Sequence, residues 1–236
     1  MKKISALITS VCILFFPFTL KAETSDDFIL PGEGDFNFKI KREKNGVDIF
    51  LEPKEGSAYF YIQRGNQKSN SGNFYGAISD YNKALAINPR ESEAYYNRGL
   101  AKKRAKDYRG AISDYTKAID INPDYGDALT NLGNTLNQIG KYKEAIMYLD
   151  KAIEINSNNY IAHYNRGISN TSLENWYESI FDYTNVIKIK PSFFQAYTNR
   201  GIIKKNLGDL KGACLDWEKG AYFNDSIAIR YFKESC

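Results

Sequence analysis

The amino-acid sequence predicts an all-α fold, an α-solenoid of five helix-turn-helix repeats with a C-terminal cap helix and a small N-terminal β-hairpin. A pattern of small and large residues recurs every 34 residues from residue 58 to residue 225. An alternating apolar segment precedes the repeats, and a short segment of different pattern follows them. The predicted organisation is a signal peptide (1–22), a hairpin or linker segment (23–57), five repeats (58–91, 92–125, 126–159, 160–193 and 194–225) and a cap helix (226–236).

The first 22 residues have the features of a secretory signal peptide. Lys2 and Lys3 precede a predominantly apolar run, and Ala22 supplies a small residue after which cleavage is expected. The alternative is an uncleaved anchor, which the shortness of the run and Pro17 disfavour. We therefore expect an exported protein, periplasmic, luminal or secreted, with no stable membrane insertion after signal cleavage.

Residues 23–57 contain the hairpin signal. Two segments of alternating apolar and polar residues flank Asn45-Gly46, the dipeptide most typical of a two-residue hairpin turn. A turn at this dipeptide would pair Arg42 with Ile49 and Ile40 with Leu51. Because a lone hairpin is marginal in water, it is expected to dock on the first repeat; otherwise the segment is a linker that orders on a partner.

Each repeat is expected to form two antiparallel helices. The eighth residue of every repeat is glycine and the twentieth is small, which allows the two helices to approach closely, while the twenty-fourth is large. Gly72, Gly140 and Gly208 follow three of the first helices, where a left-handed cap favours glycine. The glycines at the eighth place are Gly65, Gly99, Gly133, Gly167 and Gly201.

This period and pattern resemble the tetratricopeptide repeat (TPR) family. The resemblance implies a right-handed α-solenoid in which the first helix of each pair lines a concave groove. It also implies binding to a protein or an extended peptide. The family's carboxylate clamp for chaperone tails is not expected, because Ile62, Asp127 and Asn131 stand where that clamp has basic residues.

A peptide-binding row follows from the resemblance. It places the sixth residue of each repeat in the groove, and this residue is Gln63 and then asparagine four times. A primary amide both donates and accepts hydrogen bonds, so the row is similar to the asparagine ladders of peptide-binding members. The alternative is that asparagine is simply common at this place in the family. The candidate peptide-binding residues are Asn97, Asn131, Asn165 and Asn199, with Tyr96 and Tyr164 beside them.

One pair of places changes together along the repeats. The seventh residue is arginine and the twenty-third is aspartate in four repeats, as in Arg98 and Asp114, whereas the third repeat has Leu132 and Tyr148. We expect an ion pair inside each of the four repeats and an apolar contact in the third. The alternative is independent drift of the two places.

The composition excludes several classes of function. Charged residues make up 25% of the chain, and the net charge of +4 owes three charges to the signal segment, so no nucleic-acid partner is expected. The chain has no phosphate loop, dinucleotide fingerprint or metal-spaced cluster. The single histidine, His163, falls at a place where other repeats carry tyrosine or leucine, which favours a packing role. No catalytic residue, cofactor or metal is expected, and the protein is not expected to be an enzyme.

The C-terminus carries the two cysteines that remain after signal cleavage. Antiparallel packing of the cap helix on the last repeat would bring Cys214 and Cys236 side by side, and an oxidising compartment favours a disulfide. The alternative is a buried free Cys214 and a loose Cys236.

Our first hypothesis of function is an exported adaptor or scaffold that binds a protein or peptide in its groove. The second is a structural subunit of a larger envelope or exported complex.

Overall fold

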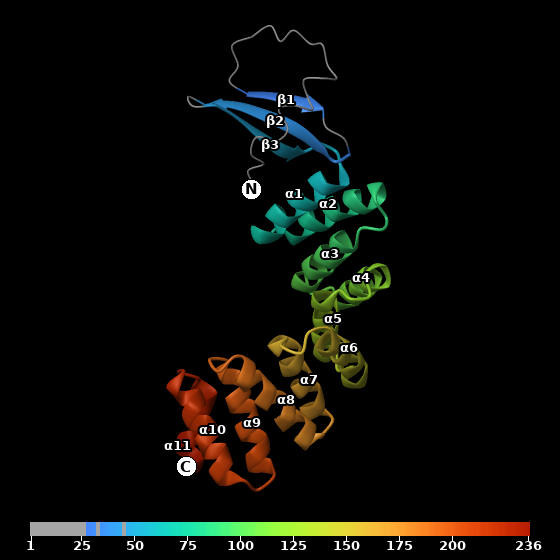
Figure 1. Ribbon diagram of the computed structural model, residues 1–236. Coiled ribbons are helices and arrows are strands. Elements are labelled where there is room, and N and C mark those ends of the chain that lie inside the picture. Colours follow the sequence, from blue (N-terminus) through green and yellow to red (C-terminus); the bar gives the residue numbers. More distant parts are fainter. Residues whose placement is uncertain (1–26, 32–33, 44–45) are drawn as a thin grey trace, which may run out of the picture.

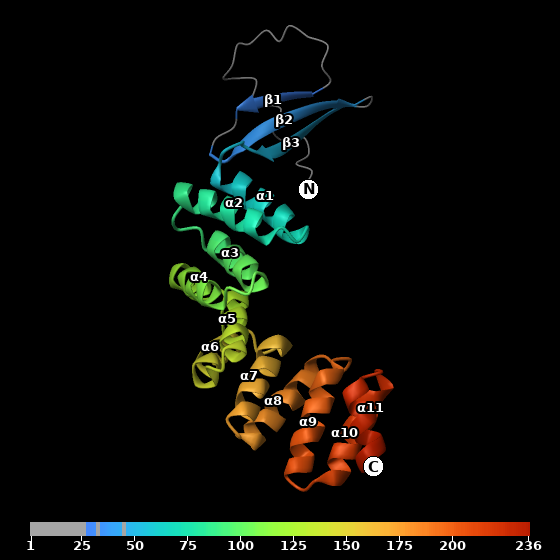
Figure 2. The same cartoon turned by 180° about the vertical axis from the view of Figure 1, so that it is seen from behind.

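The structure, a computed structural model, describes residues 27–31, 34–43 and 46–236. The predicted signal peptide (1–22) lies outside these residues. Five antiparallel helix pairs stack in sequence order between a small β-sheet at one end and a single helix at the other (Figure 1). The stack curves along its length, as the view from behind also shows (Figure 2). The chain is therefore an α-solenoid with a different element at each end.

The N-terminal sheet contains the predicted hairpin and one further strand. The strands β1 (Asp27–Pro31), β2 (Phe36–Glu43) and β3 (Gly46–Pro53) are antiparallel in the order β1-β2-β3. The further strand, β1, has five residues and pairs Ile29 with Lys39; it was not predicted from the sequence. The sheet contacts the first helix pair through Phe36, whose ring centroid lies 4.9 Å from that of Tyr59.

The predicted register of the hairpin is wrong by two positions. Arg42 pairs with Val47 and Ile40 pairs with Ile49, each two residues earlier in β3 than predicted. Residues 44–45 lie outside the described part of the chain. A shift of two residues leaves the alternation between the two faces of the sheet unchanged. The hydrophobic pattern therefore could not distinguish the two registers.

The repeats consist of a first helix (A helix) and a second helix (B helix). The A helices start at the first residue of each 34-residue window. Gly72, Gly140 and Gly208 adopt the expected left-handed conformation after their A helices, while Lys106 and Glu174 adopt it in the other two turns between A and B helices. The A helices are α1 (Ala58–Asn70), α3 (Ser92–Arg104), α5 (Gly126–Gln138), α7 (Tyr160–Ser172) and α9 (Phe194–Asn206). The B helices are α2 (Phe74–Ile87), α4 (Tyr108–Ile121), α6 (Tyr142–Ile155), α8 (Trp176–Ile189) and α10 (Leu210–Tyr222).

Within each pair, the glycine of the A helix accepts a large side chain of the B helix. A Cβ added at Gly99 would lie 2.7 Å from Cε1 of Tyr115, which leaves no room for any other residue. The same approach joins Gly201 to Trp217 at 2.6 Å. Alanines at the twentieth and twenty-seventh places, such as Ala111, are fully buried. The buried apolar residues between the two layers of helices form a series of separate clusters along the solenoid.

The predicted ion pairs within repeats are confirmed. Nε and Nη2 of Arg98 donate to the carboxylate of Asp114 at 2.9 and 2.6 Å, and Nζ of Lys102 lies 2.8 Å from the same carboxylate. In the third repeat, Leu132 and Leu136 are fully buried and Tyr148 packs against their cluster. Lys102 is therefore a third member of the cluster, which the pattern of arginine and aspartate did not predict. The equivalent clusters are Arg64, Lys68 and Asp80 in the first repeat and Arg200, Lys204 and Asp216 in the fifth.

The arginines also join neighbouring repeats. Nη1 of Arg98 donates to Oδ1 of Asn82 at 2.7 Å, and Asn82 lies in the preceding repeat. Arg166 reaches Asp150 in the same way at 2.6 Å, and Arg200 reaches Thr184 at 2.9 Å. Each of these guanidinium groups therefore fixes both the pairing of its own helices and the position of the repeat before it.

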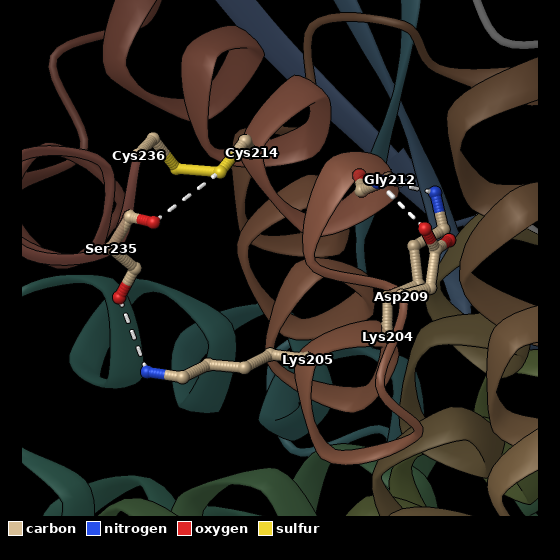
Figure 3. Close-up of a disulfide and its surroundings, with 7 residues drawn as sticks. All are labelled: Lys204, Lys205, Asp209, Gly212, Cys214, Ser235 and Cys236. Atoms are coloured by element: carbon tan, nitrogen blue, oxygen red, sulfur yellow. Dashed lines mark hydrogen bonds between the residues drawn. A yellow bond between two sulfur atoms is a disulfide. The ribbon is translucent and has the colours of Figure 1, made fainter.

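The last element, α11 (Ser226–Ser235), covers the end of the solenoid. The ring of Tyr231 stacks on that of Trp217 with centroids 4.9 Å apart, and Ala228 is fully buried. Cys214 of α10 and Cys236 form a disulfide with their Cα atoms 5.8 Å apart (Figure 3). The covalent bond thus joins the end of the chain to the final B helix.

Candidate functional site

The candidate site is the surface formed by the sixth residues of the A helices and their neighbours, which we call the A-helix face. The five residues are not equivalent, because their side-chain amides have different partners. Asn165 is buried, whereas the other four keep part of their surface exposed. The sixth residues are Gln63, Asn97, Asn131, Asn165 and Asn199.

Asn97 is the asparagine of the row with the weakest internal contacts. Its Nδ2 donates to Oε1 of Glu93 on the same helix at 3.4 Å, a long hydrogen bond. Among the described residues, no group donates to its Oδ1. The side chain is therefore free to accept a hydrogen bond from a ligand.

Asn97 lines a cavity between the first and second repeats. The cavity has a volume of about 270 Å³ and a wall rich in amides. One of these amides, Asn66, is held in place because its Oδ1 accepts the hydroxyl hydrogen of Tyr81 at 2.7 Å. Such a wall suits a neutral polar group that both donates and accepts, for example a peptide backbone. The lining residues are Asn66, Ser69, Asn70, Tyr81, Asn97 and Leu100.

Asn131 and Asn199 use their amide hydrogens inside the solenoid. Nδ2 of Asn131 lies 3.2 Å from the hydroxyl oxygen of Tyr96, and Nδ2 of Asn199 lies 3.3 Å from that of Tyr164. In both pairs the tyrosine belongs to the preceding repeat. The asparagine oxygens accept no hydrogen bond from the described part of the chain, so each remains available as an acceptor.

Tyr96 and Tyr164 act as supports for these asparagines. The ring of Tyr96 lies 4.9 Å from that of Tyr125, and the ring of Tyr164 lies 4.9 Å from that of Phe193. Burial raises the pKa of Tyr96 to about 12 and also raises the pKa of Tyr164. Both hydroxyl groups therefore stay neutral, and remain hydrogen-bond partners, to a higher pH than the hydroxyl of an exposed tyrosine.

Asn165 is part of an internal network that spans three repeats. It is 3% exposed, its Nδ2 donates to the Ile161 carbonyl oxygen at 2.9 Å, and its Oδ1 accepts from Asn134 at 2.7 Å. Lys103 in turn donates to Oδ1 of Asn134 at 2.5 Å, and burial lowers the pKa of that lysine. We therefore leave Asn165 out of the surface that faces a ligand.

His163 has a structural environment. It is 5% exposed, its Nδ1 lies 3.2 Å from Oδ1 of Asp182, and its Nε2 lies 3.1 Å from the Ser157 carbonyl oxygen. Asp182 also accepts from Arg166 and Asn170, so the histidine belongs to the ionic cluster of the fourth repeat. This placement agrees with the packing role that the sequence favours.

Two wider properties of the described residues bear on the site. In residues 27–31, 34–43 and 46–236, no three histidine, cysteine or acidic side chains gather where they could hold a metal ion. Nor does any helix in that part of the chain combine the length and apolar character needed to cross a membrane.

The sequence matches two family models, one described as tetratricopeptide repeat, over residues 92–125 and 126–159, and one described as TPR repeat, over residues 65–106. No curated protein sequence matches the chain.

Several solved structures are similar to this chain. A crystal structure of MamA is 27% identical, with 68% of this chain and 94% of MamA covered and a TM-score of 0.65. YrrB, described as a TPR protein with an unusual peptide-binding site, is 25% identical, with coverages of 75% and 92% and a TM-score of 0.66. PilW, described as a type IV pilus biogenesis factor, is 20% identical, with coverages of 70% and 77% and a TM-score of 0.64, and supports the fold alone.

Proposed function

Because the chain is a tetratricopeptide repeat protein, we propose that it is an exported adaptor that binds an extended segment of a protein partner along its A-helix face. The repeats serve as a scaffold for protein interaction, and YrrB is a similar TPR protein with a peptide-binding site. The amide-lined cavity at Asn97 carries the proposal, because its free acceptor and its polar wall suit a peptide backbone.

The binding surface proposed here is narrower than the row expected from the sequence. Asn97 contributes its oxygen in the cavity, and the oxygens of Asn131 and Asn199 continue the row. Asn165 is not part of this surface, because its oxygen already accepts a hydrogen bond from Asn134. These asparagine oxygens can accept hydrogen bonds from backbone N–H groups of the ligand. The surface therefore recognises the ligand's backbone more closely than its side chains.

Two features support export. Residues 1–22 have the basic start and apolar run of a signal peptide. The Cys214–Cys236 disulfide is of a kind that persists in oxidising compartments and is rare in the cytosol. Both are consistent with an adaptor that works in the periplasm or another exported compartment.

Selection of peptides from a random library on the purified protein tests the site. Peptides that bind the wild type should bind Asn97→Ala about 2- to 10-fold more weakly, the effect of one lost hydrogen bond of about 0.5–1.5 kcal/mol. Asn185→Ala removes the same amide from a B helix and should leave affinity unchanged. Equal affinity of all three proteins would place the ligand elsewhere, and a library that yields no binder would argue against peptide recognition.

A further inference from the structure

Lys103 is a partly buried cation of α3 that has no acidic partner. Its Nζ donates to the amide oxygen of Asn134, and it forms no ion pair with the described part of the chain. A cation that is partly removed from water is stabilised by a charge of opposite sign, and most cations of the A helices have one. Those that pair with aspartates are Arg64, Lys68, Arg98, Lys102, Arg166, Arg200 and Lys204.

The surroundings of Lys103 disfavour its charge. Burial lowers the pKa of Lys103, and the neighbouring cation Arg104 lowers it further. Arg104 is exposed and has neither a hydrogen bond nor an ion pair with the described residues. Glu93, the acidic residue of α3, lies ten residues before Lys103, about 15 Å along the helix axis. Asp107, in the turn after α3, uses its carboxylate to cap α4 at Gly110. Neither acid therefore neutralises the two cations.

A chain of amides holds Lys103 in position. Nδ2 of Asn134 donates to Oδ1 of Asn165 at 2.7 Å, and Nδ2 of Asn165 donates to the Ile161 carbonyl oxygen at 2.9 Å. Because Asn134 uses an amide hydrogen on Asn165, its oxygen is presented to Lys103. An ammonium group has three hydrogens, so two remain on Lys103 for a ligand.

Lys103 lies next to the acceptors of the A-helix face. It occupies the twelfth place of its repeat, and the twelfth residue of the first repeat, Ser69, lines the cavity at Asn97. On α5, Asn134 follows Asn131 by three residues, which is about one turn. The ammonium group therefore lies between the second and third repeats, one repeat along from the cavity and beside the free oxygen of Asn131.

We propose that Lys103, together with Arg104, binds a carboxylate of the extended segment, so that the ligand is an acidic peptide. The inference rests on the proposed function, because it uses the A-helix face as the binding surface. A carboxylate would accept the two free hydrogens of the Lys103 ammonium group, and such charge-assisted hydrogen bonds are stronger than those between neutral groups. The site differs from the family's carboxylate clamp, whose basic places are here Ile62, Asp127 and Asn131.

Two synthetic peptides test the inference without altering the protein. Both have blocked ends and alternate a polar residue with glycine; the polar residue is glutamate in one and glutamine in the other. Dissociation constants are measured from the amide chemical shifts of the isotope-labelled protein, with peptide added to about 2 mM so that weak binding is seen. The wild type should bind the glutamate peptide about tenfold more tightly, the effect of hydrogen bonds to a charged group.

Variants then assign this preference to one residue. Lys103→Met keeps the length of the side chain without its charge and should reduce the tenfold preference to less than about twofold. Lys103→Arg retains a cation and should keep most of the preference. The control is Lys151→Met, which removes an exposed lysine from the B helix α6 and should leave both dissociation constants unchanged.

The results also separate this inference from the proposed function. Equal affinity of the wild type for the two peptides, or a preference that survives Lys103→Met, would overturn the inference. If both peptides bind equally and Asn97→Ala weakens both, recognition of the peptide backbone stands without a carboxylate site. Absence of binding by either peptide also overturns the inference, and the peptides selected from the library then decide the proposed function by themselves.

Discussion

At the residue scale, buried aspartates such as Asp114 depend on cations supplied by the facing A helix. Asp114 is 2% exposed, and Arg98 and Lys102 both contact its carboxylate. In the first repeat, the hydrogen bonds from Arg64 hold the pKa of Asp80 below its usual range. A buried carboxylate without such partners costs several kcal/mol, whereas an apolar group of similar volume costs little. In the third repeat, Leu132, Leu136 and Tyr148 replace the charged residues with apolar contacts.

Substitution in the second repeat should separate these two cases. Asp114→Ala leaves Arg98 and Lys102 without their partner and should lower the free energy of unfolding by about 2–3 kcal/mol, less than for a fully buried pair because both cations reach solvent. The combination Arg98→Leu, Lys102→Leu and Asp114→Tyr copies the third repeat and should stay within about 1 kcal/mol of the wild type. Urea unfolding followed by circular dichroism measures both. A triple variant less stable than Asp114→Ala would show that the charges themselves are required.

Sequence reasoning reached the candidate residues but not their partners. The spacing of the repeats correctly brought Arg98 to Asp114, because both lie in one helix pair. The bonds that occupy Asn131 and Asn165 come from Tyr96 and Asn134 in the preceding repeat, 35 and 31 residues away. A pattern read within one repeat cannot show which amides are used in this way. Comparing each sixth residue with the side chains that face it in the preceding repeat would have indicated which amides are already hydrogen-bonded.

At the scale of elements, the 34-residue period was sufficient to predict the bounds of the helices. The strands of the N-terminal sheet were predicted less well. The helices of each pair recur with the same small and large places, so their bounds follow from the period. The register of β2 and β3 was missed by two residues, and β1 was missed entirely. A hairpin has one period of two residues to fix it, and any even shift satisfies that period.

The Cys214–Cys236 disulfide is expected to hold α11 on α10 and to stabilise this end of the solenoid. Thiol titration of the unfolded, non-reduced protein, taken after signal cleavage, should find no free thiol, and two free thiols would exclude the bond. Cys236→Ser should lower the free energy of unfolding by about 3 kcal/mol by the chain-entropy estimate for a loop of this size. Cys214→Ser and the double variant should lose a similar amount, because each change removes the same bond. A much larger loss for Cys214→Ser alone would point to packing at that residue.

At the scale of the whole molecule, stability is expected to be highest in the middle. The largest apolar cluster joins α4, α5, α6 and α7 and includes Leu129, Leu132, Leu136 and Leu149, all fully buried. In a solenoid each repeat contacts only its neighbours, so the free energy of local opening depends on the interfaces on either side. Central repeats have two such interfaces, and the first repeat has the small sheet on one side.

Hydrogen exchange should therefore be slowest in α5 and α6. The amides of α1 and α2 should exchange faster, because opening at this end breaks one interface between repeats. The amides of α10 should be protected by α11 and the disulfide, and reduction should raise their exchange rate without changing that of α5. Uniform exchange along the chain would instead indicate that the solenoid unfolds in a single step.

The link between each arginine and the repeat before it bears on how such a chain changes its length. If residues 126–159 were deleted, Arg166 would follow the second repeat and meet Thr116 in place of Asp150. A threonine hydroxyl is the acceptor that Arg200 already uses at Thr184. Gene duplication or deletion in whole repeats would thus leave the guanidinium group with an acceptor at the new joint. Such a chain can therefore gain or lose whole repeats, and each repeat changes the length of the surface that it offers to a partner.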